Sequence, residues 1–97
     1  MEKISISKLH HNIPHYEIIK DFIKTDKKIN DNFIKIIQKK LNPLKIDETD
    51  GLKLIWPKKW IHIRKSNTEP IIRFYAESEN LNSSRKLILQ AKKLFNN

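Results

Sequence analysis

Residues Arg64–Glu77, with the sequence RKSNTEPIIRFYAE, decide the predicted fold. The pattern predicts one strand that ends at Arg64, a tight polar loop over residues 66–70, and a second strand over Ile71–Glu77. The loop places hydroxyl and amide side chains between two arginines. Such donors suit an anion with several oxygens, and phosphate is the obvious candidate. The stretch therefore predicts a hairpin that carries an anion-binding loop.

Alternation in the two strands of this hairpin predicts which side chains face a core. Successive residues of a strand point to opposite faces of the sheet. The residues expected to share faces with apolar neighbours are Ile61 and Ile63 in the first strand and Ile72, Phe74 and Ala76 in the second. Arg64 and Arg73 are therefore expected to lie away from the core, close to the loop that joins their strands.

The remaining chain is predicted to supply further strands and two or three helices. Ile29, Phe33, Ile36, Ile37 and Leu41 recur at helical spacing, with Asp26 or Asn30 as the cap. Asp50-Gly51 is predicted to be a turn. The other expected elements are a short helix over Ile4–Asn12, strands over Tyr16–Lys24, Leu52–Trp56 and Trp60–Arg64, a short extended segment at Leu44–Ile46, and a last helix with a buried stripe of Ser84, Leu87, Ile88, Ala91, Leu94 and Phe95, capped by Asn80 or Asn82. These elements predict an α+β fold in which helices cover one face of an antiparallel four-stranded sheet.

Composition limits the possible classes of protein. The 97 residues are enough for one domain, and the apolar fraction of 38% with 32% charged residues is typical of a soluble chain. No apolar run has the length of a membrane span, and no signal peptide is recognised, so a cytoplasmic location is expected. The absence of cysteine excludes disulfides and thiol chemistry, and a single glycine excludes glycine-rich nucleotide loops.

The formal charge of +9 raises the alternative of a small basic nucleic-acid-binding domain. Lysine supplies most of this charge, so the cations are expected to be spread over the surface. Trp56, Trp60 and Tyr75 are possible stacking platforms for bases, but packing within the domain is favoured because no RNA-binding motif is present.

The histidines offer a weak metal-binding alternative. Two adjacent histidines, His10 and His11, do not easily share one helix face, and His15 brings no acidic partner except Glu17. Surface histidines without a metal are therefore favoured. His62 lies on the strand that leads to the polar loop and is a possible additional phosphate contact. A partly exposed strand residue without such a role is the favoured interpretation.

The segment from Asp50 to Glu77, DGLKLIWPKKWIHIRKSNTEPIIRFYAE, resembles the C-terminal domain of the α-D-phosphohexomutases. The pattern Arg-x-Ser-Asn-Thr-Glu-Pro-x-x-Arg is long and specific. Asn67 favours the phosphomannomutase/phosphoglucomutase branch over the phosphoglucosamine mutases, which usually carry glycine there. The likeness extends over the whole chain and is strongest over residues 50–79.

This resemblance implies a fourth domain of TATA-binding-protein-like fold that closes over a cleft and holds the phosphate of a hexose 1- or 6-phosphate. Arg64, Ser66, Asn67 and Thr68 would contact that phosphate. The other matching residues are Glu69 and Pro70, which would shape the loop, and Arg73, which would lie in a second layer or contribute to the charge field.

The resemblance also implies what this chain lacks. In the family, the phosphorylated serine, the Mg²⁺-binding acidic loop and the sugar-specifying loop belong to three other domains, and none of these motifs occurs here. The 97 residues are therefore expected to form a single domain without catalytic residues, metal or cofactor, inactive alone, whose partners are the other domains and a phosphosugar. A non-catalytic interaction domain with the same fold is a further alternative.

Overall fold

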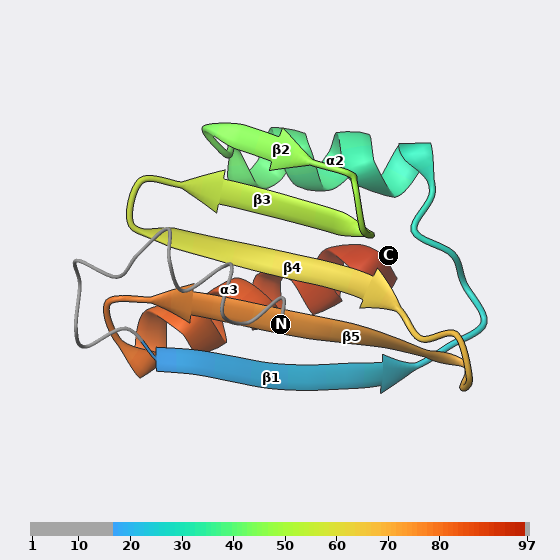
Figure 1. Cartoon of the computed structure of the whole chain (residues 1–97). Helices are drawn as coiled ribbons and strands as arrows, with labels where there is room; N and C mark the ends of the chain where they lie inside the picture. The colour runs from blue at the N-terminus through green and yellow to red at the C-terminus, as the bar shows by residue number, and fades with distance from the viewer. Residues whose placement is uncertain (1–16, 97) are drawn as a thin grey trace.

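The computed structural model describes residues 17–96, which form two layers (Figure 1). One layer is an antiparallel sheet with the strand order β1-β5-β4-β3-β2, and helices α2 and α3 cover one of its faces. The elements are β1 (Glu17–Lys24), α2 (Asp31–Leu41), β2 (Lys45–Asp47), β3 (Leu52–Trp56), β4 (Lys59–Lys65), β5 (Ile71–Ser78) and α3 (Leu81–Asn96). The predicted α+β class, with helices on one face of an antiparallel sheet, is confirmed.

The sheet has five strands, so the prediction of four is wrong. The additional strand is β2, in which Ile46 lies opposite Leu54 and Lys45 opposite Ile55. The sequence indicated only a short extended segment at Leu44–Ile46, because three residues are too few to show an alternating pattern. Its place at the edge of the sheet depends on pairing with β3, which is a tertiary interaction.

The core lies between the sheet and the two helices. Side chains predicted to face the core in β4 and β5 are fully buried, namely Ile61, Ile63, Ile72, Phe74 and Ala76. Helix α3 contributes its predicted stripe, with Leu94 only partly buried. Phe33 of α2 and Phe95 of α3 meet edge to face with ring centroids 5.0 Å apart. The alternation therefore predicted the core side of β4 and β5 correctly. The helical spacing predicted Phe33 and Ile37 of α2 correctly, whereas Ile36 of the same predicted stripe is 38% exposed.

The helices end at residues that satisfy their terminal backbone groups. The side chain of Asn30, one of the two predicted caps, accepts a hydrogen bond of 2.9 Å from the N–H of Phe33. At the other end, Asn42 adopts a left-handed conformation with φ 47°, and its N–H donates to the carbonyl of Gln38. In front of α3, Asn80 accepts from the N–H of Ser83 at 2.8 Å, so Asn80 fills the capping position.

The sheet face opposite the helices carries a polar and aromatic cluster. Trp60 is 2% exposed, and its Nε1–H donates to Oε1 of Glu77 at 2.8 Å. Lys53 Nζ lies 5.1 Å from the centroid of the Trp60 ring. Burial lowers the pKa of Lys53 below its ordinary value, against the opposing attraction of Asp47 and Glu77.

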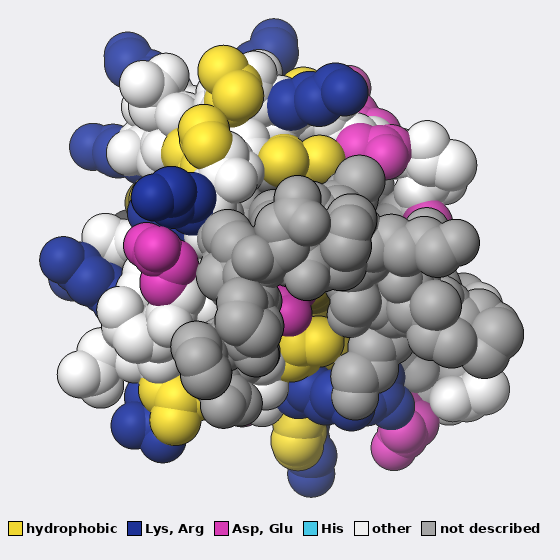
Figure 2. Space-filling view, turned by 60° about the vertical axis from the view of Figure 1, so that its left-hand side comes forward, with side chains coloured by type: hydrophobic (Ala, Val, Ile, Leu, Met, Phe, Trp, Pro, Cys, Tyr) yellow, Lys and Arg dark blue, Asp and Glu magenta, His cyan; other side chains and the backbone are white. Residues whose placement is uncertain are grey.

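Both tryptophans are packed into the domain. Trp56 is half-buried, and its Nε1–H donates to the carbonyls of Leu41 and Asn42 at the end of α2. Together with the buried Trp60, this agrees with the interpretation that favoured packing over base stacking. Among the described residues that Figure 2 shows, lysine and arginine side chains lie at several separate places, with acidic, apolar and neutral side chains between them.

Several predictions concern residues outside the described range. The expected helix over Ile4–Asn12 and the three histidines His10, His11 and His15 lie there, as does Tyr16, the first residue of the predicted first strand. Within residues 17–96, no helix is long and apolar enough to span a membrane.

Candidate anion-binding site at the β4–β5 loop

Three connections lie together at the end of the sheet where β4 passes into β5 (Figure 1). The loop of residues 66–70 joins these two strands. On one side, the N–H of Thr25, just after β1, donates to the carbonyl of Pro70 at 2.7 Å. On the other side, Gly51, just before β3, packs against Arg64. Neighbouring segments therefore hold the loop at both of its ends.

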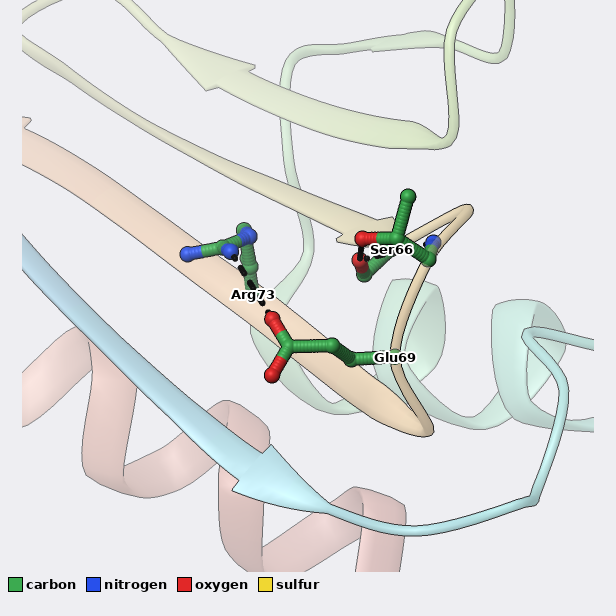
Figure 3. A network of polar contacts seen from close by, with 4 residues as sticks. Ser66, Glu69 and Arg73 are labelled. Atoms are coloured by element: carbon green, nitrogen blue, oxygen red, sulfur yellow. Dashed lines mark hydrogen bonds and ion pairs between the residues drawn. The ribbon is translucent and has the colours of Figure 1, made fainter.

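Hydrogen bonds within the loop gather its two hydroxyl groups. The N–H of Ser66 donates to the carbonyl of Ile71 at 3.0 Å and closes the hairpin. The N–H of Thr68 lies 3.3 Å from Oγ of Ser66, and the two hydroxyl oxygens are 3.4 Å apart (Figure 3). The N–H of Ile71 donates to the carbonyl of Glu69 at 2.8 Å. The loop thus presents two adjacent hydroxyls on a fixed backbone.

The tip of the loop is open to solvent. Asn67, Thr68, Glu69 and Pro70 are exposed, whereas Ser66 is half-buried. The side chain of Asn67 has no hydrogen-bond partner among residues 17–96. Its amide is therefore available for a ligand without the loss of an existing contact.

The two arginines lie directly opposite each other on β4 and β5. They share the sheet face away from the helices, as predicted, because Ile63 and Phe74 beside them face the core. Like charges placed directly opposite each other in a sheet are destabilising unless an anion lies near them. Arg64 Nη1 is 3.6 Å from Oδ2 of Asp50, and Arg73 Nη2 is 3.9 Å from Oε1 of Glu69 (Figure 3).

His62 does not face the loop as a free donor. It is 6% exposed, its ring centroid is 6.2 Å from that of Tyr75, and its Nε2 donates to the carbonyl oxygen of Asp50. His62 lies on β4, two residues before Arg64, and its ring holds the turn that precedes β3. The expectation that it is a partly exposed strand residue is wrong, because the ring is almost fully buried.

The structure brings most of the predicted site residues together at one hairpin. Arg64, Ser66, Asn67 and Thr68 follow one another at its bend, and Glu69 and Arg73 form an ion pair behind it. The acidic partner of Arg64, Asp50, was predicted only as part of a turn. Among residues 17–96, no group of three or more metal-binding side chains is present.

The chain matches the family "Phosphoglucomutase/phosphomannomutase, C-terminal domain" over residues 19–89. The chain belongs to this family. The matched range contains all five strands except the first two residues of β1, the whole of α2, and the loop of residues 66–70. The resemblance seen in the sequence is therefore confirmed as membership of the phosphohexomutase C-terminal domain family.

Individual phosphohexomutases are also similar to this chain. It is 31% identical over 96 residues, or 96% of its length, to a phosphoglucosamine/phosphogalactosamine mutase of Sulfurisphaera tokodaii, of which it covers 21%. It is 30% identical over 79 residues, or 80% of its length, to a probable phosphoglucosamine mutase of Methanococcoides burtonii, of which it covers 18%. It is 43% identical over 44 residues, or 45% of its length, to a phosphoglucomutase/phosphomannomutase of Thermococcus kodakarensis, of which it covers 10%.

The chain thus spans about one fifth of the length of the first of these mutases. The relatives carry different sugar names, so they do not separate the phosphomannomutase/phosphoglucomutase branch, which Asn67 favours, from the phosphoglucosamine mutases.

Proposed function

We propose that this phosphohexomutase C-terminal domain binds the phosphate of a hexose 1- or 6-phosphate through Arg64, Ser66, Asn67 and Thr68. The observation that carries the proposal is the pair of opposed arginines at the base of a loop with two adjacent hydroxyls. A phosphate dianion placed there would accept hydrogen bonds from several donors and offset the repulsion between the guanidinium groups. Glu69 and Pro70 would shape the loop, and Arg73 would contribute from behind it.

The domain would supply binding and not bond-making. It would hold the phosphate that does not react, so that the opposite end of the hexose faces the reacting group in the rest of the enzyme. Positioning of a bound substrate can contribute about 7–11 kcal/mol to a rate in favourable cases, shared among all domains. Binding energy from a remote phosphate also drives the closure of a mobile domain over a cleft.

We further propose that chemistry requires domains outside these 97 residues. The phosphorylated serine, the Mg²⁺ site and the sugar-specifying loop expected in a complete phosphohexomutase would be supplied by those domains. The present domain, which we expect to have a TATA-binding-protein-like fold, would be inactive alone. Its side chains meet the need of an enzyme that must accept a phosphate from either end of the sugar, because Arg64, Ser66 and Thr68 would recognise the anion and not the ring.

A titration of the 97-residue chain tests this function. Backbone amide signals of residues 64–69 are followed by NMR while glucose 1-phosphate, glucose 6-phosphate or glucose is added at constant ionic strength. Both phosphosugars are expected to shift the same loop signals in a saturable way, with weak affinity, and glucose is expected to leave them unchanged. Equal shifts with glucose, or shifts confined to other regions, would contradict the proposal. A strong response to an oligonucleotide instead would favour the nucleic-acid alternative.

A further inference from the structure

We propose that Asp50 is a positioning residue, whose carboxylate fixes the guanidinium of Arg64 in the direction from which it meets phosphate. The inference rests on the proposed function of the loop and extends it to the turn between β2 and β3. Asp50 itself would not be a phosphate ligand, since its carboxylate and the phosphate carry the same sign of charge.

The turn that carries Asp50 is fixed against β4 by two contacts. The Nε2–H of the buried His62 donates to the carbonyl oxygen of Asp50. The next residue, Gly51, has φ +75° and approaches β4 so closely that an added Cβ would lie 2.5 Å from the carbonyl oxygen of Ile63 and 3.0 Å from Cβ of Arg64. The backbone at Asp50 therefore has a defined position relative to Arg64, so the Cβ atom of Asp50 has a defined position as well.

The carboxylate lies at the guanidinium end of Arg64. Oδ2 of Asp50 is 3.6 Å from Nη1, the Arg64 side chain is 29% exposed, and that of Asp50 is 54% exposed. A half-exposed ion pair of this kind adds little to folding stability. It restricts the rotamers of a long side chain, however, and the entropy lost by ordering such a side chain otherwise opposes binding. The contact therefore matters more for ligand affinity than for the fold.

Arg73 has the same arrangement with its own acidic residue. Its Nη2 lies 3.9 Å from Oε1 of Glu69. Each of the two opposed arginines is thus paired with a carboxylate from a different segment, Asp50 from the β2–β3 turn and Glu69 from the loop itself. The pairing with Asp50 couples the loop to a turn 14 residues earlier in the chain.

Three variants of the 97-residue chain separate positioning from charge. Asp50→Ala removes the carboxylate, and Asp50→Asn keeps the size of the side chain but removes the charge of the ion pair. Glu48→Ala is the matched control, because it removes one negative charge from an exposed residue of the same segment. In each variant, the heteronuclear NOE of the Arg64 Nε–Hε group reports the order of the side chain without ligand. A titration with inorganic phosphate at constant ionic strength reports affinity.

We expect Asp50→Ala to lower the Arg64 NOE and to weaken phosphate binding by about 3- to 10-fold, the effect of one long side chain that must be ordered on binding. Asp50→Asn lacks the charge of the ion pair and should therefore lower the NOE and weaken phosphate binding in the same direction as Asp50→Ala. Glu48→Ala should leave the NOE unchanged and should not weaken binding, because it only reduces the negative charge near the loop.

An unchanged NOE in Asp50→Ala, or phosphate binding as tight as or tighter than that of the wild type, overturns the positioning role. If the proposed phosphate-binding function is wrong, the titrations give a different result. In that case, the wild type and Arg64→Ala would respond to phosphate equally, whatever the NOE of Arg64 in the Asp50 variants.

Discussion

Gly51 has a conformation and surroundings that no other residue type can match without strain. Its φ of +75° lies in the left-handed region, which costs a residue with a Cβ about 1–2 kcal/mol. A Cβ at this position would also lie 2.5 Å from a backbone oxygen of β4. Overpacking of this kind typically costs about 1–3 kcal/mol. The substitution Gly51→Ala should therefore lower the free energy of unfolding by about 2–5 kcal/mol.

Thermal unfolding followed by circular dichroism measures this effect. For a domain of this size, 1 kcal/mol corresponds to about 4–8 °C in Tm, so Gly51→Ala should lower Tm by at least about 8 °C. Glu48→Ala, a surface change in the same segment, should change the free energy of unfolding by no more than about 0.5 kcal/mol. The backbone amide signals of Ile63 and Arg64 should shift in Gly51→Ala and not in the control. If Gly51→Ala unfolds within about 2 °C of the wild type, the close approach between the turn and β4 is wrong.

Three further predictions concern the sheet and the helices. Trp60→Phe should reduce the free energy of unfolding by about 1–3 kcal/mol in a urea titration, because it leaves the buried carboxylate of Glu77 without its donor; an unchanged midpoint would contradict this. Asn30→Ala should cost about 1 kcal/mol through the lost N-cap, and Asn30→Asp should retain most of the stability, whereas equal losses in both would argue against capping. The hydrogen bond from Lys92 lowers the pKa of Asp21 below its ordinary value of 3.8. The ionised Asp21 therefore stabilises the fold fully at pH values above 3.8, and this stabilisation is lost as pH falls through the lower pKa of the folded state. The difference in free energy of unfolding between the wild type and Asp21→Asn should therefore decrease from pH 5 to pH 2. A difference that increases would refute the lowered pKa of Asp21.

Local patterns in the sequence were sufficient to predict most of the fold. The bounds Leu52–Trp56 of β3 were predicted without error, and the helix predicted from Ile29 to Leu41 begins two residues later at Asp31. Period-two alternation identified the side of β4 and β5 that faces the helices, but it did not indicate that Trp60 and His62 on the opposite face of β4 are buried as well. These signals arise within single elements, where spacing along the chain determines direction in space.

Interactions between distant segments were not predictable in the same way. Strand β2 depends on its pairing with Leu54, and the ion pair of Asp50 with Arg64 joins residues 14 positions apart. The hydrogen bond between Trp60 and Glu77 likewise requires the register of β4 against β5. Alternation placed Trp60, Arg64 and Glu77 on the sheet face away from the core but did not determine their partners.

The candidate site was predictable in its residues and less so in its arrangement. The hairpin pattern placed Arg64 and Arg73 away from the core, and the resemblance to the phosphohexomutases suggested phosphate as the ligand. The structure adds that the two arginines are directly opposite each other and that each has an acidic partner. It also shows that His62 supports the turn at Asp50.

The affinity of this chain for glucose 6-phosphate, compared with that of Arg64→Ala and Arg64→Lys, tests the central claim most directly. Loss of a charge-assisted contact is worth about 1.5–3 kcal/mol, so Arg64→Ala should weaken binding at least about tenfold in the NMR titration. Arg64→Lys should also lose affinity, because an ammonium group lacks the planar fork of donors. Binding by Arg64→Ala within about twofold of the wild type would contradict the assignment of the loop as a phosphate site.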